Sequence, residues 1–270
     1  AGGGDMVFDH TGNQHHGIID GAEWAEYLTG CTDPEANDYN PDALIDDGSC
    51  EYPDTGDYAL SFDGDGYVIK EIPNFLSSHS KGTISTWVKF DIVDDWQLIF
   101  GSADYASGNR YIELFLNIDG KVSFAQWNAD GGNDTYVYGN TILNAGQWYY
   151  IVITSDGNEY RMFINGEEES LTFQTGSNNG DWFADTDNRD NFSIGVLKYN
   201  NSMVSDLQGT IDEISIWSEN LTQEEIQTYM YADLNGNEND LAAYWSFNSG
   251  DGDVLYDRSG NLNHGDIIGA

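Results

Sequence analysis

The stretch GQWYYIVITSDGNEYRMFINGE, residues 146–167, decides the fold of this chain. Residues 148–155 and 160–164 within it are rich in aromatic and β-branched residues and alternate as strands do. Such runs predict β-strands. The Asn165-Gly166 pair that follows is a strong short-range signal for a hairpin turn. We therefore predict antiparallel strands for this part of the chain.

The same pattern continues on both sides of this stretch. A second hairpin signal, Asp119-Gly120, separates two further alternating runs. Strands of this number and spacing predict an all-β, two-sheet antiparallel sandwich. One short helix is expected at residues 222–231, where Thr222 is a capping residue and Glu224 and Glu225 occupy the first turn. The other predicted strands are residues 58–62, 67–69, 83–90, 97–101, 111–118, 122–127, 192–196 and 210–217.

The charge of the chain is strongly unbalanced. Its 270 residues include 9 Lys and Arg against 47 Asp and Glu, a formal net charge of −38. Such a charge repels nucleic acid phosphates and anionic lipid, so we expect no nucleic-acid partner. The sequence has no apolar run near the roughly 18 residues that a membrane span needs, so we expect no direct membrane insertion. Bound divalent metal, or adaptation of the surface to salt, would offset the self-repulsion.

Two cysteines, Cys31 and Cys50, flank a polar acidic stretch. Their proximity predicts a local disulfide, which forms in oxidising compartments. An extracellular or cell-surface location follows from it. The alternative is a pair of free thiols in a cytosolic protein.

The two ends of the chain repeat one another. Residues 4–22 read GDMVFDHTGNQHHGIIDGA and residues 252–270 read GDVLYDRSGNLNHGDIIGA, identical at ten of nineteen positions at an offset of 248 residues. The repeat predicts a tandem array with a period near 248 residues. Its partners would be neighbouring repeats or identical subunits, joined through this duplicated terminal motif.

Several strings together resemble the laminin G-like branch of the concanavalin A-like lectin and glucanase superfamily. They are YALSFDGDGYV (58–68), GTISTWVKF (82–90), residues 146–167, GTIDEISIWSENLTQEEI (209–226), and the segment 234–265, which resembles the part with which such domains begin. The resemblance covers about four fifths of the chain and implies a jelly-roll sandwich. The domains expected are 1–30, terminal motif and connector; 31–52, a small disulfide-pinned acidic module; 57–232, the sandwich; and 233–270, a repeat of the opening segment.

The place of residues 233–270 is left open by the family's usual order of strands. These residues open the next repeat, fill a gap in this domain, or donate a strand to a neighbouring subunit. The sequence does not choose among the three.

The acidic module also resembles a known element, the calcium-binding thrombospondin type 3 repeats. The resemblance implies a Ca²⁺ site, because carboxylate and amide oxygens are the ligands that calcium prefers. The alternative is a solvated loop pinned by its disulfide. The candidate ligands are Asp33, Asp38, Asn40, Asp46 and Asp47.

A second Ca²⁺ site is implied by the superfamily resemblance, which places calcium at the rim of the sandwich. Asp212 in GTIDEISIW is the matching aspartate. In the alternative interpretation, Asp9 and Asp257 only stabilise tight turns through side-chain hydrogen bonds. The expected companions of Asp212 are Asp63 and Asp65, together with Asp9 and Asn13 or with their repeats Asp257 and Asn261.

Catalysis is not expected. The glucanases of the superfamily use alternating carboxylates on one strand, which can flank a glycosidic bond, and no such string occurs. Asp212 and Glu213 are adjacent, so on a regular strand they point to opposite faces. Glu113 stands alone.

The sequence favours a non-catalytic, calcium-binding adhesion or structural module of a repetitive cell-surface or filament protein. The alternative is a calcium-dependent lectin module that binds extracellular glycans, since exposed aromatic rings stack on sugars. We expect Trp87, Trp148 and Trp217 to belong to the core. The candidates for stacking on sugars are Trp96, Trp127, Tyr136 and Trp182.

Overall fold

The computed structural model describes residues 5–13, 15–23, 28–128 and 134–270. The chain divides into two compact units, Ala1–Tyr52 and Pro53–Ala270, which are described separately. Within the described ranges, no helix is long and apolar enough to span a membrane.

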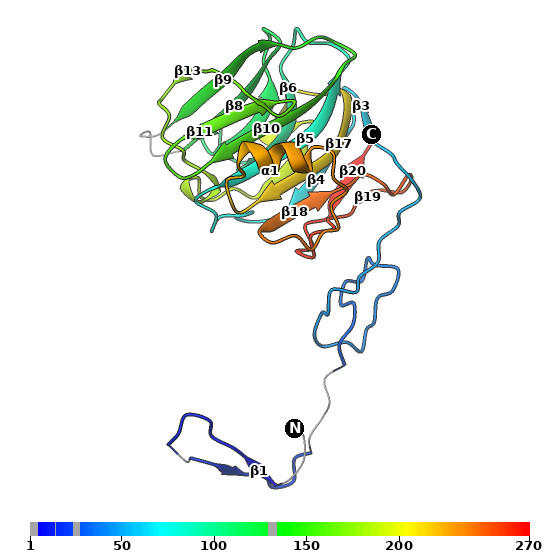
Figure 1. The fold of residues 1–270 in the computed structure, drawn as a ribbon. Helices are drawn as coiled ribbons and strands as arrows, with labels where there is room; N and C mark the ends of the chain where they lie inside the picture. The colour runs from blue at the N-terminus through cyan, green and yellow to red at the C-terminus, as the bar shows by residue number, and fades with distance from the viewer. Residues whose placement is uncertain (1–4, 14, 24–27, 129–133) are drawn as a thin grey trace. The chain divides into compact units, whose positions relative to one another are not determined.

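The second unit is a sandwich of two antiparallel sheets (Figure 1). The first is a seven-stranded sheet with the order β12-β11-β10-β5-β17-β18, in which β3 also pairs with β17. Its strands are β3 (Leu60–Asp63), β5 (Gly82–Phe90), β10 (Trp148–Ser155), β11 (Tyr160–Ile164), β12 (Glu167–Glu168), β17 (Gln208–Trp217) and β18 (Leu241–Trp245).

The second sheet has nine strands in the order β13-β9-β8-β7-β6-β14-β4-β20-β19. They are β4 (Tyr67–Glu71), β6 (Gln97–Ala103), β7 (Tyr111–Leu116), β8 (Lys121–Trp127), β9 (Thr135–Ile142), β13 (Leu171–Thr175), β14 (Asn191–Ile194), β19 (Val254–Leu255) and β20 (Gly265–Ile268). A separate hairpin is formed by β15 (Leu197–Tyr199) and β16 (Ser202–Val204), and a 3-10 turn spans Phe183–Asp185.

The apolar core lies between the sheets, as strand alternation requires. On β7, Ile112 and Leu114 face this core, while Tyr111 and Phe115 belong to a second apolar cluster on the opposite face. The turn at Asn165 has the positive φ of 53° that a tight hairpin needs. The predicted two-sheet antiparallel sandwich is confirmed.

The C-terminal segment completes this same sandwich. Strand β18 pairs with β17, and β20 pairs with β4 at the edge of the larger sheet (Figure 1). Within this single chain, residues 241–245 and 265–268 thus pair with strands of their own sandwich.

Helix α1 (Gln223–Tyr229) covers the outer face of the seven-stranded sheet (Figure 1). Thr222 caps it by accepting a hydrogen bond from the backbone N–H of Glu225, whose carboxylate accepts in return from the N–H of Thr222. This reciprocal cap explains why the helix begins where it does. Ile226 is fully buried in a cluster with Trp217 and Tyr150 of the sheet, which anchors the helix.

The first unit contains a hairpin and the acidic module. Strands β1 (Met6–Val7) and β2 (Gly17–Ile18) pair antiparallel. The predicted disulfide between Cys31 and Cys50 is present, with Cα atoms 4.6 Å apart.

Candidate functional site

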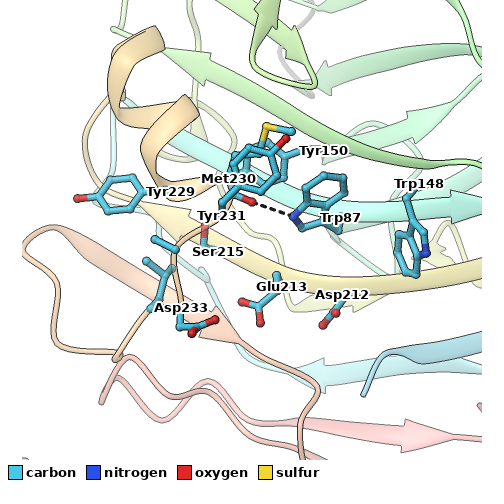
Figure 2. Close-up of a pocket in the computed structure, with 12 residues that line it drawn as sticks. Trp87, Trp148, Tyr150, Asp212, Glu213, Ser215, Tyr229, Met230, Tyr231 and Asp233 are labelled. Carbon is cyan, nitrogen blue, oxygen red and sulfur yellow. Dashed lines mark hydrogen bonds between the residues drawn. The ribbon is translucent and has the colours of Figure 1, made fainter. Parts of the chain in front are cut away.

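A pocket of about 310 Å³ opens on the outer face of the seven-stranded sheet, beside the C-terminal end of α1 (Figure 2). Three strands of the sheet and the segment after the helix form its walls. The lining side chains are Trp87 of β5, Trp148 and Tyr150 of β10, Asp212, Glu213 and Ser215 of β17, and residues 229–234.

Asp212 and Glu213 both line this pocket, although they are adjacent on one strand (Figure 2). The expectation that they point to opposite faces is wrong. The pairing of β17 with β5 breaks between Asp212 and Ser215, and Glu213 has a φ of 54°. A β-bulge of this kind adds one residue to a strand and turns two consecutive side chains to the same face.

The core explains why the bulge is there. Ile211, Ile214 and Ile216 are all buried between the sheets. Their spacing of three and then two residues does not fit regular alternation, so one extra residue has to be accommodated after Ile211. The string IDEISI carries this signal in the sequence.

Burial makes these two carboxyl groups unusual. It raises the pKa of Asp212 to about 7, with the neighbouring charge of Glu213 as a further cause. The Oδ1 atom of Asp212 is buried and has no hydrogen-bond partner among the described residues. Burial also raises the pKa of Glu213, and the hydroxyl of Tyr244 donates a hydrogen bond to its Oε2. Perturbed carboxyls in a pocket are typical of functional sites.

Aromatic rings form the rest of the wall. Trp87 donates from Nε1 to the carbonyl of Met230 at 3.2 Å, which ties the pocket to the end of α1. Trp148 is 40% exposed and Tyr231 is 80% exposed. The assignment of Trp148 to the core is therefore wrong, because its exposed side chain lines a pocket on the outer face. Trp87 is half-buried and packs against the apolar cluster beneath α1, and it also lines the pocket. Trp217 is buried, as expected.

The four predicted stacking residues lie elsewhere. Trp96, Trp127 and Tyr136 lie on the face of the nine-stranded sheet that points away from the core, where they stack on aromatic neighbours of their own. Trp182 is fully buried and packs on Phe124 in the main core, so its assignment to a sugar site is wrong. Trp182 follows a Gly-rich loop, a context that favours exposure, but tertiary packing buries its side chain.

Glu113 lies on this same outer face of the nine-stranded sheet. Its neighbours across the strands are Gly101 and Ala125, whose side chains offer no hydrogen-bonding group, and no hydrogen bond to its carboxyl group is found among the described residues. Burial raises the pKa of its carboxyl to about 8.

The sequence comparison assigns the sandwich to a family. Residues 62–227 match the concanavalin A-like lectin/glucanases superfamily. The chain belongs to this superfamily. A comparison with curated protein sequences found no match.

Several solved structures are similar to the chain in fold, at low sequence identity. A proposed carbohydrate-binding protein from Bacteroides ovatus has a TM-score of 0.59 and 19% identity over 82% of this chain and 60% of its own length. The Ruminococcus gnavus IT-sialidase CBM40, solved with α2,3 sialyllactose, has a TM-score of 0.53 and 18% identity over 63% of this chain and 95% of its own. Streptococcus pneumoniae NanB sialidase has a TM-score of 0.52 and 20% identity over 63% of this chain and 27% of its own. This chain thus spans 60% of the Bacteroides ovatus protein.

The calcium ligands implied for the acidic module serve local turns. Asp33 is 3% exposed, accepting hydrogen bonds from the hydroxyl of Tyr52 at 2.6 Å and from the N–H of Glu35. Carboxylates that accept from nearby backbone N–H groups stabilise turns. Asn40, Asp46 and Asp47 each accept in the same way from the backbone N–H two residues further on, and Asp38 accepts from the N–H of Glu51 across the module.

The ligands implied at the rim of the sandwich are also engaged in turns. Asp257 is fully buried and accepts backbone N–H bonds from three residues. Three other rim candidates make local bonds: Asp9 accepts from Thr11 and His15, Asp63 accepts from Asp65, and Asn13 donates to Thr11. Asn261 donates to the carbonyl of Ala242 on β18.

In the part of the chain that the structure describes, no group of three or more His, Cys, Asp or Glu side chains is placed to hold a metal. The structure thus does not bring the implied carboxylates together, and a calcium site among them stays a prediction.

Proposed function

We propose that this chain is a non-catalytic glycan-binding module and that the pocket beside α1 holds the sugar. The observation that carries the proposal is that one pocket contains both Asp212 and the exposed rings of Trp148 and Tyr231. The buried Oδ1 of Asp212 has no hydrogen-bond partner among the described residues. Sugars have an apolar face that stacks on aromatic rings. Their hydroxyl groups donate hydrogen bonds that carboxylates accept. The volume is at the lower end of the range for ligand sites, about 300–1,000 Å³, which suits a small saccharide.

The charge of the pocket limits the class of glycan. Asp212, Glu213 and Asp233 all line it, in a chain with a net charge of −38. Carboxylates repel anionic ligands, so the proposed ligand is a neutral or amino sugar. Sialic acids and uronic acids would be rejected at this pocket.

The proposal keeps the extracellular setting and the adhesive role that the sequence favours, since a glycan-binding module on a cell surface is an adhesive module. The disulfide supports an oxidising compartment. We also propose that sugar binding depends on Ca²⁺, which the comparison of binding with and without chelator tests.

A glycan array with neutral, amino and sialylated sugars, probed with and without chelator, tests the proposal. We expect neutral or amino sugars to bind and sialylated sugars not to bind. The best ligand is then titrated against Trp148→Ala and, as a matched control on the other sheet, Trp127→Ala. Weakening by Trp148→Ala alone supports the pocket; weakening by Trp127→Ala alone, or no binding across the array, would contradict it. Release of cleaved sugar would contradict the non-catalytic part.

A further inference from the structure

The hairpin of the first unit is a structural copy of the hairpin that ends the second unit. The two share the sequence repeat at an offset of 248 residues, and their strands also pair in the same register. The paired residues are Met6–Ile18 and Val7–Gly17 in the first hairpin and Val254–Asp266 and Leu255–Gly265 in the second.

The loops of the two hairpins are closed by the same hydrogen bonds. The Asp9 carboxylate accepts from two backbone N–H groups of its own loop, as does that of Asp257. The N–H of Asp9 donates to Nδ1 of His16 at 3.0 Å, and the N–H of Asp257 donates to Nδ1 of His264 at 2.9 Å. In its described residues, the first hairpin therefore shares the register and these loop hydrogen bonds with the second, though it belongs to a different unit.

The two copies differ in burial. Val7 is 53% exposed, whereas its counterpart Leu255 is 3% exposed within the core of the sandwich. Phe8 is 58% exposed, and Asp9 is only half-buried where Asp257 is fully buried. Within its own unit, the first hairpin thus presents to solvent the apolar side that the second hairpin buries.

The second hairpin is received by β4 and β18, which we call the cradle. Strand β20 adds to the edge of β4. From β18, the N–H of Tyr244 donates to Oδ1 of Asp257 at 3.0 Å, and Nε1 of Trp245 donates to the carbonyl of Asn263 at 3.0 Å. These contacts use a backbone carbonyl and an aspartate, and the first hairpin has both at the equivalent positions, the aspartate being Asp9.

Close approach to the cradle also requires a glycine. A Cβ at Gly265 would lie 2.5 Å from the side chain of Val68 in β4, so this position does not admit a larger residue without movement. The equivalent position of the first hairpin is Gly17.

We propose that residues 5–20 dock on the cradle of a second sandwich of this kind, as residues 253–268 dock on the cradle of this one. The hairpin adds a strand to the β4 edge, and Val7 enters the apolar position that Leu255 occupies here. Strand addition of this type joins domains through backbone hydrogen bonds and alternate side chains. The interaction is independent of glycan binding and would link successive modules of an array.

The full chain provides its own cradle for a test. A protease site is placed at the exposed Asp251-Gly252 loop, and the folded chain is cut there, so that residues 253–270 remain bound without a covalent link. Cutting is needed because a tethered hairpin competes at an effective concentration of the order of millimolar. Labelled peptide 253–270 is added at the lowest urea concentration at which it replaces the resident copy, and labelled peptide 5–20 is tested under those same conditions.

We expect peptide 5–20 to bind with a Kd at most about 100-fold higher than that of peptide 253–270. Unlabelled 253–270 should displace it. The Asp9→Ala and Gly17→Val forms of the peptide should fail to bind, one for loss of the loop bonds and the other for a clash with β4. If peptide 253–270 exchanges and peptide 5–20 does not bind, the proposal is wrong; binding that survives Gly17→Val would equally show that the hairpin docks elsewhere.

Discussion

Asp212 and Glu213 follow one another on β17 and line the same pocket, because the bulge at Glu213 breaks the alternation of the strand. The arrangement places two carboxyl groups beneath the aromatic wall of Trp87 and Trp148 (Figure 2). It also leaves Glu213 in a backbone region that residues other than glycine, asparagine and aspartate rarely adopt. Strain of this kind concentrates at functional sites.

Removing either pocket carboxylate should weaken sugar binding. Hydrogen bonds to charged groups contribute about 1.5–3 kcal/mol, and about 1.4 kcal/mol is tenfold in affinity. We therefore expect Asp212→Ala and Glu213→Ala each to raise Kd at least about tenfold in calorimetric titration with the best array ligand. Glu167→Ala, on the exposed tip of the β11–β12 hairpin, is the matched control and should leave Kd unchanged.

Loss of binding caused by unfolding is a separate outcome, which thermal denaturation detects. Asp212→Ala should be at least as stable as the parent protein near neutral pH, because burial already opposes the charged form of Asp212. A less stable variant would show that Asp212 supports the fold and that its effect on binding is indirect.

Replacing Glu113 should change how stability depends on pH. The pKa of Glu113 is raised to about 8 in the folded protein, against about 4.3 in an unfolded chain. Between these values the folded state binds the extra proton, so its stability falls as pH rises through this window and levels off above about pH 8. Glu113→Gln removes this loss of stability at higher pH, because glutamine does not ionise.

The melting temperature of Glu113→Gln should thus match that of the parent near pH 4 and exceed it increasingly up to pH 8. We expect a gain of at least about 2–4 °C at pH 8, the shift that about 1 kcal/mol produces in a domain of this size. A constant difference at all pH values would show that Glu113 is not the titrating group.

Trp182 and Trp148 should differ sharply in their effects on stability. Trp182 is fully buried in the core, so Trp182→Ala should cost about 3–5 kcal/mol in the free energy of unfolding. Trp148 is 40% exposed, so Trp148→Ala should cost less than about 1 kcal/mol. Urea denaturation followed by circular dichroism measures both. Similar costs would contradict the placement of Trp148 on the outer face.

Calcium binding by the acidic module is a prediction from sequence that can be measured directly. Titration of the full chain with Ca²⁺ should give a binding heat that Asp46→Ala and Asp47→Ala reduce. A ligand at 100 times its Kd stabilises the folded state by about 2.7 kcal/mol, so saturating Ca²⁺ should delay thermal unfolding of the module. Absence of both the heat and the shift would exclude a calcium site in residues 31–52.

Strand alternation and turn residues determined the sandwich from the sequence. The predicted runs at residues 83–90, 122–127 and 148–155 differ from β5, β8 and β10 by at most one residue at an end. The helix at 223–229 was found from its cap at Thr222. These signals are local: side-chain period, backbone preference and capping act within a few residues, so they can be read without the fold.

The tertiary structure decided where the site lies. Trp87 and Trp148 have the same strand context as core tryptophans, and Trp182 has the context of a loop, so neighbouring residues could not distinguish pocket from core. Which face of a strand is covered depends on how the sheets stack and where α1 packs. The bulge at Glu213 likewise follows from burying both Ile211 and Ile214 between the sheets. The sequence by itself determined the strands and turns because those follow from local preferences; only long-range packing decided which aromatic and acidic side chains meet at a surface pocket.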